Sequence, residues 1–197
     1  SSASFINLFW DAKFWGYSFT LAFSAGTFFS FLGGAPYVAT KVYNLNSVVS
    51  GLVMGFPAAG YFIGNYLSGR YSKFYGIDYM ALRGILLVIF GMFICLVITV
   101  FYRDTPYFFF GLCSFVGLGN GLIIPNASVG ILSVNENLSG TAGGIGNAIM
   151  IGTGAILASL TSYYLENQTS SSYLVFIMLL SGALSYTSLY IFVLRNK

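Results

Sequence analysis

Six long apolar stretches, almost free of charge, are the feature that most constrains the fold of this chain. They cover residues 14–37, 48–67, 84–101, 107–131, 140–164 and 173–194. A helix needs about 20 mostly apolar residues to cross a bilayer, and each stretch is close to that length. Strands of a transmembrane barrel would be about 10 residues long with alternating polarity. The pattern therefore predicts an all-α membrane protein, a bundle of six transmembrane helices that forms a single domain over residues 1–197.

The composition favours the same class and excludes several functions. Of the 197 residues, 57% are hydrophobic and 7% are charged, whereas roughly 25% are charged in an average soluble domain. The chain has no His, which removes imidazole-based catalysis, metal ligation and proton relays. Cys95 and Cys113 lie in different apolar stretches and are interpreted as small buried hydrophobic residues. We expect no enzymatic activity, no metal and no cofactor.

The cationic residues predict how the chain is oriented. Connections between the stretches are short, so successive spans are antiparallel. One side collects Lys13, Arg70, Lys73, Arg83, Arg195 and Lys197, and the other has Lys41 and Arg103. Since cytoplasmic loops are enriched in Lys and Arg, both termini are predicted to be cytoplasmic, in a bacterial inner membrane. These cations mark the ends of spans and form no patch for nucleic acid. No signal peptide is expected, because no basic segment precedes a short apolar core.

Two Gly- and Pro-containing segments indicate an internal repeat. The first span ends with Gly33-Gly-Ala-Pro36, and the fourth contains Gly117-Leu-Gly-Asn-Gly-Leu-Ile-Ile-Pro125. Helix breaks are expected at Pro36 and Pro125, which would lie near opposite faces of the membrane. Such a pair is typical of two inverted three-helix repeats. The alternative is that each Gly/Pro pair is only a packing kink.

Residues 64–76 have the sequence Gly-Asn-Tyr-Leu-Ser-Gly-Arg-Tyr-Ser-Lys-Phe-Tyr-Gly. This segment resembles the Gly-x-x-x-Asp-Arg-x-Gly-Arg-Arg signature of the major facilitator superfamily, in the weaker copy of its C-terminal half. Gly69 stands where the stronger copy has Asp, and Ser72 where it has Gly. The motif Ala35-Pro36-Tyr-Val, the motif Pro125-Asn-Ala and residues 139–146 are similar to drug:proton antiporters of the bicyclomycin-resistance (Bcr/CflA) type.

The resemblance implies the C-terminal six helices of a twelve-helix transporter, which is half of the major facilitator fold. It implies a conformational latch that holds neighbouring helices together in one transport state. The latch residues would be Gly64, Gly69, Arg70, Lys73 and Gly76. The alternative is that Arg70 and Lys73 are plain orientation charges. The implied partners are membrane lipid, the missing N-terminal six-helix half or a homologous chain, and a small hydrophobic organic substrate.

Two spans carry mixed polar and aromatic stripes at helical spacing. The stripe residues are Tyr17, Thr20, Ser24, Thr27 and Phe31 in the first span, and Phe110, Ser114 and Asn120 in the fourth. The resemblance places both helices against a central cavity, and an aromatic wall with few hydroxyls suits weakly polar organic molecules. Alternatively, the hydroxyls bond to their own helix and the glycines pack on neighbours. Without a second half, the stripe of the first span is expected to face lipid.

The acidic residues bear on the energy source. All five of them are assigned to connections between spans: Asp11, Asp78, Asp104, Glu136 and Glu166. A proton-coupled transporter needs a titratable group on its pathway, so that group is expected in the missing half. Our leading hypothesis is half of a proton-coupled multidrug exporter that works by alternating access and is incomplete on its own. The alternative is a non-transporting subunit or scaffold that pairs with another six-helix chain.

Overall fold

The computed structural model describes residues 2–196, with side chains from residue 6 onward, and every regular element in this range is a helix. The α-helices are α1 (Ser2–Trp10), α2 (Ala12–Tyr37), α3 (Ser47–Val53), α4 (Phe56–Tyr75), α5 (Ile77–Phe101), α6 (Pro106–Ser133), α7 (Ser139–Leu165) and α8 (Ser172–Leu189). Two π-helical turns, η1 (Val38–Val42) and η3 (Tyr190–Leu194), extend α2 and α8, and the 3₁₀ turn η2 (Glu136–Leu138) precedes α7.

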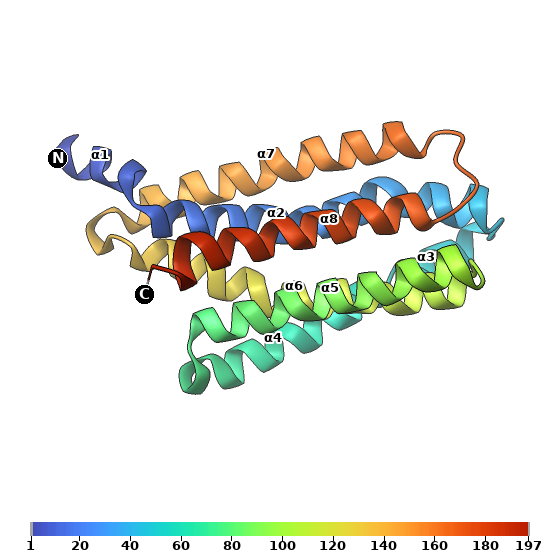
Figure 1. Cartoon of the computed structure of the whole chain (residues 1–197), viewed down its shortest axis with the longest axis horizontal. Coiled ribbons are helices and arrows are strands. Elements are labelled where there is room, and N and C mark those ends of the chain that lie inside the picture. The colour runs from blue at the N-terminus through green and yellow to red at the C-terminus, as the bar shows by residue number, and fades with distance from the viewer. Residues whose placement is uncertain (1, 197) are drawn as a thin grey trace.

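Six helical segments of the described chain are long and apolar enough to cross a membrane. They are α2 with η1, α3 with α4, α5, α6, η2 with α7, and α8 with η3. This confirms the predicted all-helical membrane class and the predicted number of spans. The spans lie side by side along the long axis of the molecule, and both termini lie at the same end as the α4–α5 connection (Figure 1).

The segment 64–76 is not a loop between helices. It forms the last turns of α4, and Gly76 alone separates α4 from α5. Gly76 has a φ of +85°, a conformation open to glycine and costly for other residues. Because the chain reverses within one residue, α5 begins at Ile77 and not near residue 84 as predicted. Asp78 therefore lies in the first turn of a spanning helix, where the helix dipole favours a negative charge.

Neither Pro36 nor Pro125 ends its helix, contrary to the predicted breaks. Pro36 lies inside α2, which continues through the π turn to Val42, and Pro125 lies inside α6. Proline is tolerated within membrane helices where side chains and local π geometry satisfy the freed backbone groups. Side chains also add hydrogen bonds close to both prolines: the Thr40 hydroxyl donates to the Pro36 carbonyl at 2.8 Å, and the Asn126 amide donates to the Leu122 carbonyl at 2.6 Å.

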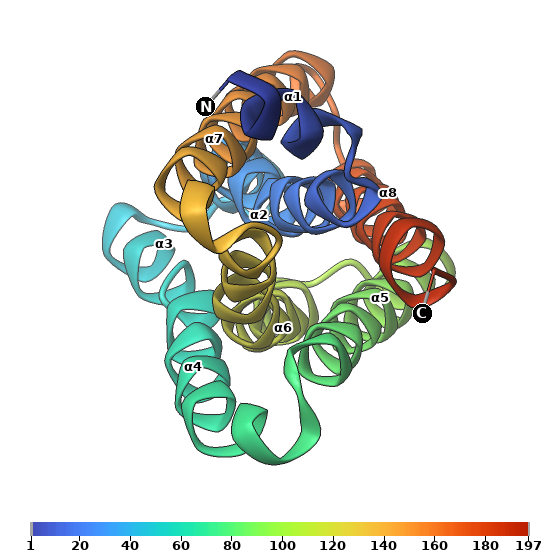
Figure 2. The same cartoon turned by 90° about the vertical axis from the view of Figure 1, so that its left-hand side faces the viewer.

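Two helices, α2 and α6, form the centre of the bundle (Figure 2). The helix α2 packs against α6, α7 and α8, whereas α6 packs against α2, α4 and α5, and α5 also contacts α8. The segments α2 and α6 are the most buried of the six spans, and α7 and α3–α4 are the least buried. The two central helices thus separate a group made of α7 and α8 from a group made of α4 and α5.

The contact between α4 and α6 depends on four glycines, Gly60 and Gly64 on α4 and Gly117 and Gly121 on α6. A Cβ atom added at Gly117 would collide with the Pro57 carbonyl, and one at Gly64 with the Leu118 carbonyl. A Cβ atom at Gly121 would lie 2.6 Å from the Tyr61 carbonyl oxygen. Glycines four residues apart on both helices allow the two backbones to touch, as in closely packed membrane helices.

Candidate functional site

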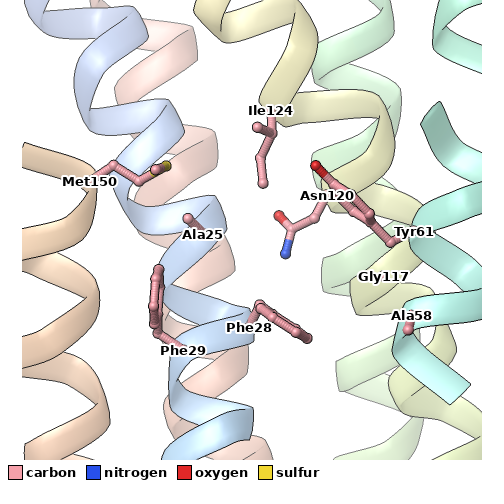
Figure 3. Close-up of a pocket in the computed structure, with 9 residues that line it drawn as sticks. All are labelled: Ala25, Phe28, Phe29, Ala58, Tyr61, Gly117, Asn120, Ile124 and Met150. Carbon is pink, nitrogen blue, oxygen red and sulfur yellow. The ribbon is translucent and has the colours of Figure 1, made fainter. Parts of the chain in front are cut away.

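A cavity of about 390 Å³ lies between four of the spans (Figure 3). It is lined by Ala25, Phe28 and Phe29 of α2, Ala58 and Tyr61 of α4, Gly117, Asn120 and Ile124 of α6, and Met150 of α7. Its lining residues come from the central helices α2 and α6 and from α4 and α7, which flank these two helices (Figure 2). Its volume lies within the range of small-molecule sites, about 300–1,000 Å³.

The walls of the cavity are mostly apolar. Three aromatic rings, those of Phe28, Phe29 and Tyr61, border it together with aliphatic side chains. The only side-chain polar groups among the lining residues are the Asn120 amide and the Tyr61 hydroxyl, and none of the lining residues is charged. Such a site can hold a small, uncharged organic molecule and orient it by one or two hydrogen bonds.

Asn120 takes part in a short hydrogen-bond relay that fixes the orientation of its amide. Its Nδ2 donates to Thr27 Oγ1 at 3.1 Å, and the Thr27 hydroxyl donates to the Ser24 carbonyl at 2.6 Å. Because the Thr27 proton is engaged, Thr27 can only accept from Asn120, so the amide nitrogen faces Thr27. The Asn120 carbonyl oxygen is left buried, with no donor among the described residues.

The predicted stripe of the first span lies inside the bundle. Tyr17, Thr20, Ser24, Thr27 and Phe31 are all buried. Ser24 and Ser185 of α8 share a hydrogen bond of 2.5 Å, and the Phe31 ring contacts those of Phe109 and Phe110. The expectation that this stripe faces lipid in the single chain is not met, because α6 and α8 cover it.

The predicted cavity residues of the fourth span have different environments. Phe110 is buried in the aromatic cluster, Ser114 is half-buried, and Asn120 lines the cavity. Of the eight predicted residues, Asn120 is therefore the one that reaches this cavity. The sequence pattern found the polar faces of the central helices. It could not show that most of these faces are covered by neighbouring helices.

The predicted latch residues have separate roles in the packing. Gly64 belongs to the α4–α6 contact, Gly76 makes the turn, and Gly69 faces open space among the described atoms. Arg70 and Lys73 are exposed, and the Arg70 guanidinium lies 3.4 Å from the Tyr66 hydroxyl. The Arg83 guanidinium stands 4.8 Å from the centre of the Tyr79 ring. Tyrosines beside cations are typical of a membrane–water interface.

Two aspartates at opposite ends of α2 are held by hydroxyl groups, which sequence reasoning missed. Tyr17 donates to Asp78 at 2.6 Å, and Asp78 is only 8% exposed. Tyr43 donates to Asp104 at 2.5 Å, and Asp104 also accepts from Ser170 and from the amide and hydroxyl of Ser171. Burial, and after it the hydrogen bond to Asp104, raises the pKa of Tyr43 well above its ordinary value. Both tyrosine–aspartate pairs are 61 residues apart in sequence, and no local pattern marks them before the helices are packed.

Two further asparagines lie within spans and have different environments. The Asn126 amide donates to Ser68 Oγ at 2.8 Å across the α4–α6 contact. The Asn147 side chain is exposed on α7 and forms no interhelical hydrogen bond with the described residues. An exposed amide on a spanning helix is costly in lipid.

No protein-family model matches this sequence, and no curated protein matches it either. Within residues 2–196, no group of three or more Cys, Asp or Glu side chains is placed to hold a metal ion. The assignment of a function therefore depends on the cavity and on the surfaces that border it.

Proposed function

We propose that this chain is one six-helix half of a secondary transporter of the major facilitator type, which exports small, weakly polar organic molecules by alternating access. The observation that carries the proposal is the uncharged aromatic cavity between α2, α4, α6 and α7. In transporters built from two repeated halves, substrate sites lie near the bilayer midplane at the interface between the repeats. A cavity that a single chain closes on only some sides fits half of such a site.

The pattern of helix contacts supports two inverted three-helix repeats. Suppose that the first three spans are exchanged in order with the last three, so that α2 corresponds to α6, α3–α4 to α7, and α5 to α8. The α2–α7 contact then corresponds to the α6–α4 contact, and the α2–α8 contact corresponds to the α6–α5 contact. The α2–α6 and α5–α8 contacts are each converted into themselves. The first helix of each group runs in the opposite direction across the membrane. This symmetry is what an inverted repeat requires.

Small residues on the outer faces of α7 and α3–α4 support pairing with a second six-helix unit. Gly140, Gly144 and Gly152 are exposed on α7, and no described atom of another part of the chain fills the space beside them. Gly51 of α3 is open in the same way. Rows of small residues let membrane helices approach closely, and Asn147 beside the α7 row lacks a partner. The second unit is either the missing half or another copy of this chain.

The energy source and the orientation follow from the charged groups. No acidic residue lines the cavity, so we infer that the coupling proton binds on the second unit. Five of the seven cations in residues 2–196 belong to the end where the termini lie, which we place in the cytoplasm. The lack of an acid at the cavity is also compatible with a second candidate function. In that case the chain is a non-transporting subunit that pairs with another six-helix chain.

The test begins by identifying the second unit. Single cysteines in place of Gly51 and Gly144 are crosslinked in native membranes, and the crosslinked assembly is purified and reconstituted without the crosslinks into liposomes. Under an imposed pH gradient, we expect the assembly to accumulate an uncharged aromatic dye and the isolated monomeric chain to do nothing. Ala58→Phe, which fills the cavity, should abolish accumulation. An assembly that moves no dye would support the subunit hypothesis, and gradient-driven uptake by the monomer would contradict both proposals.

A further inference from the structure

We propose that the cavity binds an uncharged, planar aromatic molecule that donates one hydrogen bond to the carbonyl oxygen of Asn120. This inference rests on the proposed function in taking the cavity as the substrate site, although binding itself does not require transport. It adds a specific requirement: the ligand carries an N–H or O–H group, and no charge, at the point where it meets α6.

The unsatisfied oxygen of Asn120 sets the first requirement for a ligand. Asn120 is 2% exposed and lines the cavity, and its Oδ1 accepts from none of the described groups. The relay through Thr27 to the Ser24 carbonyl holds the Asn120 amide nitrogen on Thr27. The amide therefore cannot flip without losing that hydrogen bond. A buried acceptor without a donor destabilises the folded protein. A ligand that brings a donor to this oxygen removes that destabilisation, and one without a donor does not.

The lack of charge around the cavity sets the second requirement. The lining residues carry neither an acid nor a base. A cation or an anion would lose its hydration on entering the cavity and gain no opposite charge there, which is strongly unfavourable. The cavity therefore selects neutral molecules, and the donor must be a neutral N–H or O–H group.

The shape of the cavity sets the third requirement. Phe28 and Phe29 project from α2 and Tyr61 from α4, so rings border two sides of the cavity (Figure 3). Aromatic rings pack favourably against other rings in offset or edge-to-face geometry. Phe28 and Met150 are only half-buried, and the unbranched Met150 side chain can adapt to the ligand. A flat ligand of two or three fused rings suits this space.

The experiment compares carbazole with N-methylcarbazole, which differ in the single N–H donor. The full chain is placed in lipid nanodiscs and dialysed to equilibrium against empty nanodiscs, so that only binding beyond lipid partitioning is measured. We expect carbazole to bind about fivefold to tenfold more tightly than its methylated analogue, the effect of one hydrogen bond. In Asn120→Leu, this preference should fall to within about twofold, since the added methyl group remains but the acceptor is gone.

Control variants keep the proposal falsifiable if Asn120→Leu folds poorly. Tyr61→Phe removes the other polar group of the cavity and should retain the preference for carbazole. Ala58→Phe should abolish binding of both compounds, whereas Ala59→Phe on the neighbouring, non-lining position should not; both alanines are exposed on α4. Equal binding of the two compounds, loss of the preference in Tyr61→Phe, or unchanged binding in Ala58→Phe would overturn the proposal. Equal binding would show a purely apolar site, of the kind a lipid chain could fill.

Failure of this inference is distinct from failure of the proposed function. Donor-dependent binding by an assembly that transports nothing would retain the ligand class and remove the transporter. Gradient-driven transport that does not distinguish the two carbazoles would retain the transporter and remove the role of Asn120.

Discussion

At each end of α2, one tyrosine hydroxyl connects the helix to an aspartate near an end of α5. The Tyr17–Asp78 pair lies where α5 begins, and the Tyr43–Asp104 pair lies just beyond its last turn. Asp104 accepts from three hydroxyls and one backbone amide, and three of these four donors belong to Ser170 and Ser171 in the α7–α8 connection. Through these residues, three parts of the chain that are distant in sequence are fastened at one end of the bundle.

Removing the Tyr17 hydroxyl should destabilise the bundle without changing its fold. In Tyr17→Phe, the buried Asp78 loses a donor, and hydrogen bonds to charged groups contribute about 1.5–3 kcal/mol. The free energy of unfolding, measured by titration with a denaturing detergent, should fall by about that amount. Tyr107→Phe is the matched control because Tyr107 is 88% exposed. Equal stability of the two variants would contradict the prediction.

Tyr43 should make the protein sensitive to high pH. Its pKa is raised in the folded state, whereas in the unfolded chain it ionises near pH 10. The stabilisation is therefore complete below about pH 10 and is lost as the pH rises towards the folded pKa. Between pH 8 and pH 11, the melting temperature of the wild type should fall more than that of Tyr43→Phe. Parallel pH profiles would show that Tyr43 ionises equally easily in both states.

Residue partners were the part of the site that the sequence predicted least well. Helical spacing identified Thr20, Ser24 and Thr27 as one face of α2, and that face exists. What covers it depends on α6 and α8, which are about 90 or more residues away and whose approach no local pattern records. Asn120 belongs to the predicted stripe of the fourth span, but its unpaired oxygen is recognised only once the positions of Thr27 and Ser24 are known.

At the scale of elements, backbone proximity between α4 and α6 is the most specific contact. The glycines of both helices sit where a methyl group would meet the backbone of the other. The apolar faces of these helices alone cannot distinguish them from lipid-facing helices, since lipid is as apolar as a leucine side chain. Close van der Waals packing therefore determines which helices associate.

Gly117→Ala should weaken this contact strongly. Its Cβ would meet the carbonyl of Pro57, which is backbone and can move only if α4 moves. We expect a loss of about 1–3 kcal/mol in the free energy of unfolding, the usual cost of overpacking. Gly111→Ala on the same helix meets no described atom within 4 Å and should be neutral or slightly stabilising. Similar effects at the two positions would mean that helix propensity, not contact, decides the outcome.

The number and approximate position of the spans could be predicted because apolar length alone determines which segments can cross a membrane. The start of α5 was placed too late, since Asp78 and Arg83 looked like a connection. A charged residue in the first turn is compatible with a spanning helix when it has a partner such as Tyr17. The prolines were misjudged for a related reason: a proline inside a membrane helix does not have to end it. Side chains add hydrogen bonds close to both positions, from Thr40 and from Asn126.

At the scale of the whole molecule, all described spans cross between two ends, and the cations are unequally divided between them. Single cysteines replacing Phe74 and Asn196 report on the end that holds the termini, and one replacing Tyr102 reports on the other. The native Cys95 and Cys113 are buried and should react little. In sealed cells, an impermeant thiol reagent should label the Tyr102 site alone. Labelling of the Phe74 and Asn196 sites from outside would reverse the proposed orientation.

The central position of α2 has a consequence for biosynthesis. Two of the helices that pack on it, α7 and α8, are made last, more than a hundred residues after α2 leaves the ribosome. At a synthesis rate of about 5–20 residues per second, Ser185 is made on the order of 10 s after the hydroxyl residues of α2. These hydroxyls lack their α8 partner during that time. The helices α4, α5 and α6 are consecutive and can associate as soon as they emerge. The helices α4, α5 and α6 are therefore expected to assemble first, although α2 is made before them. The helix α2 is among the last to be enclosed.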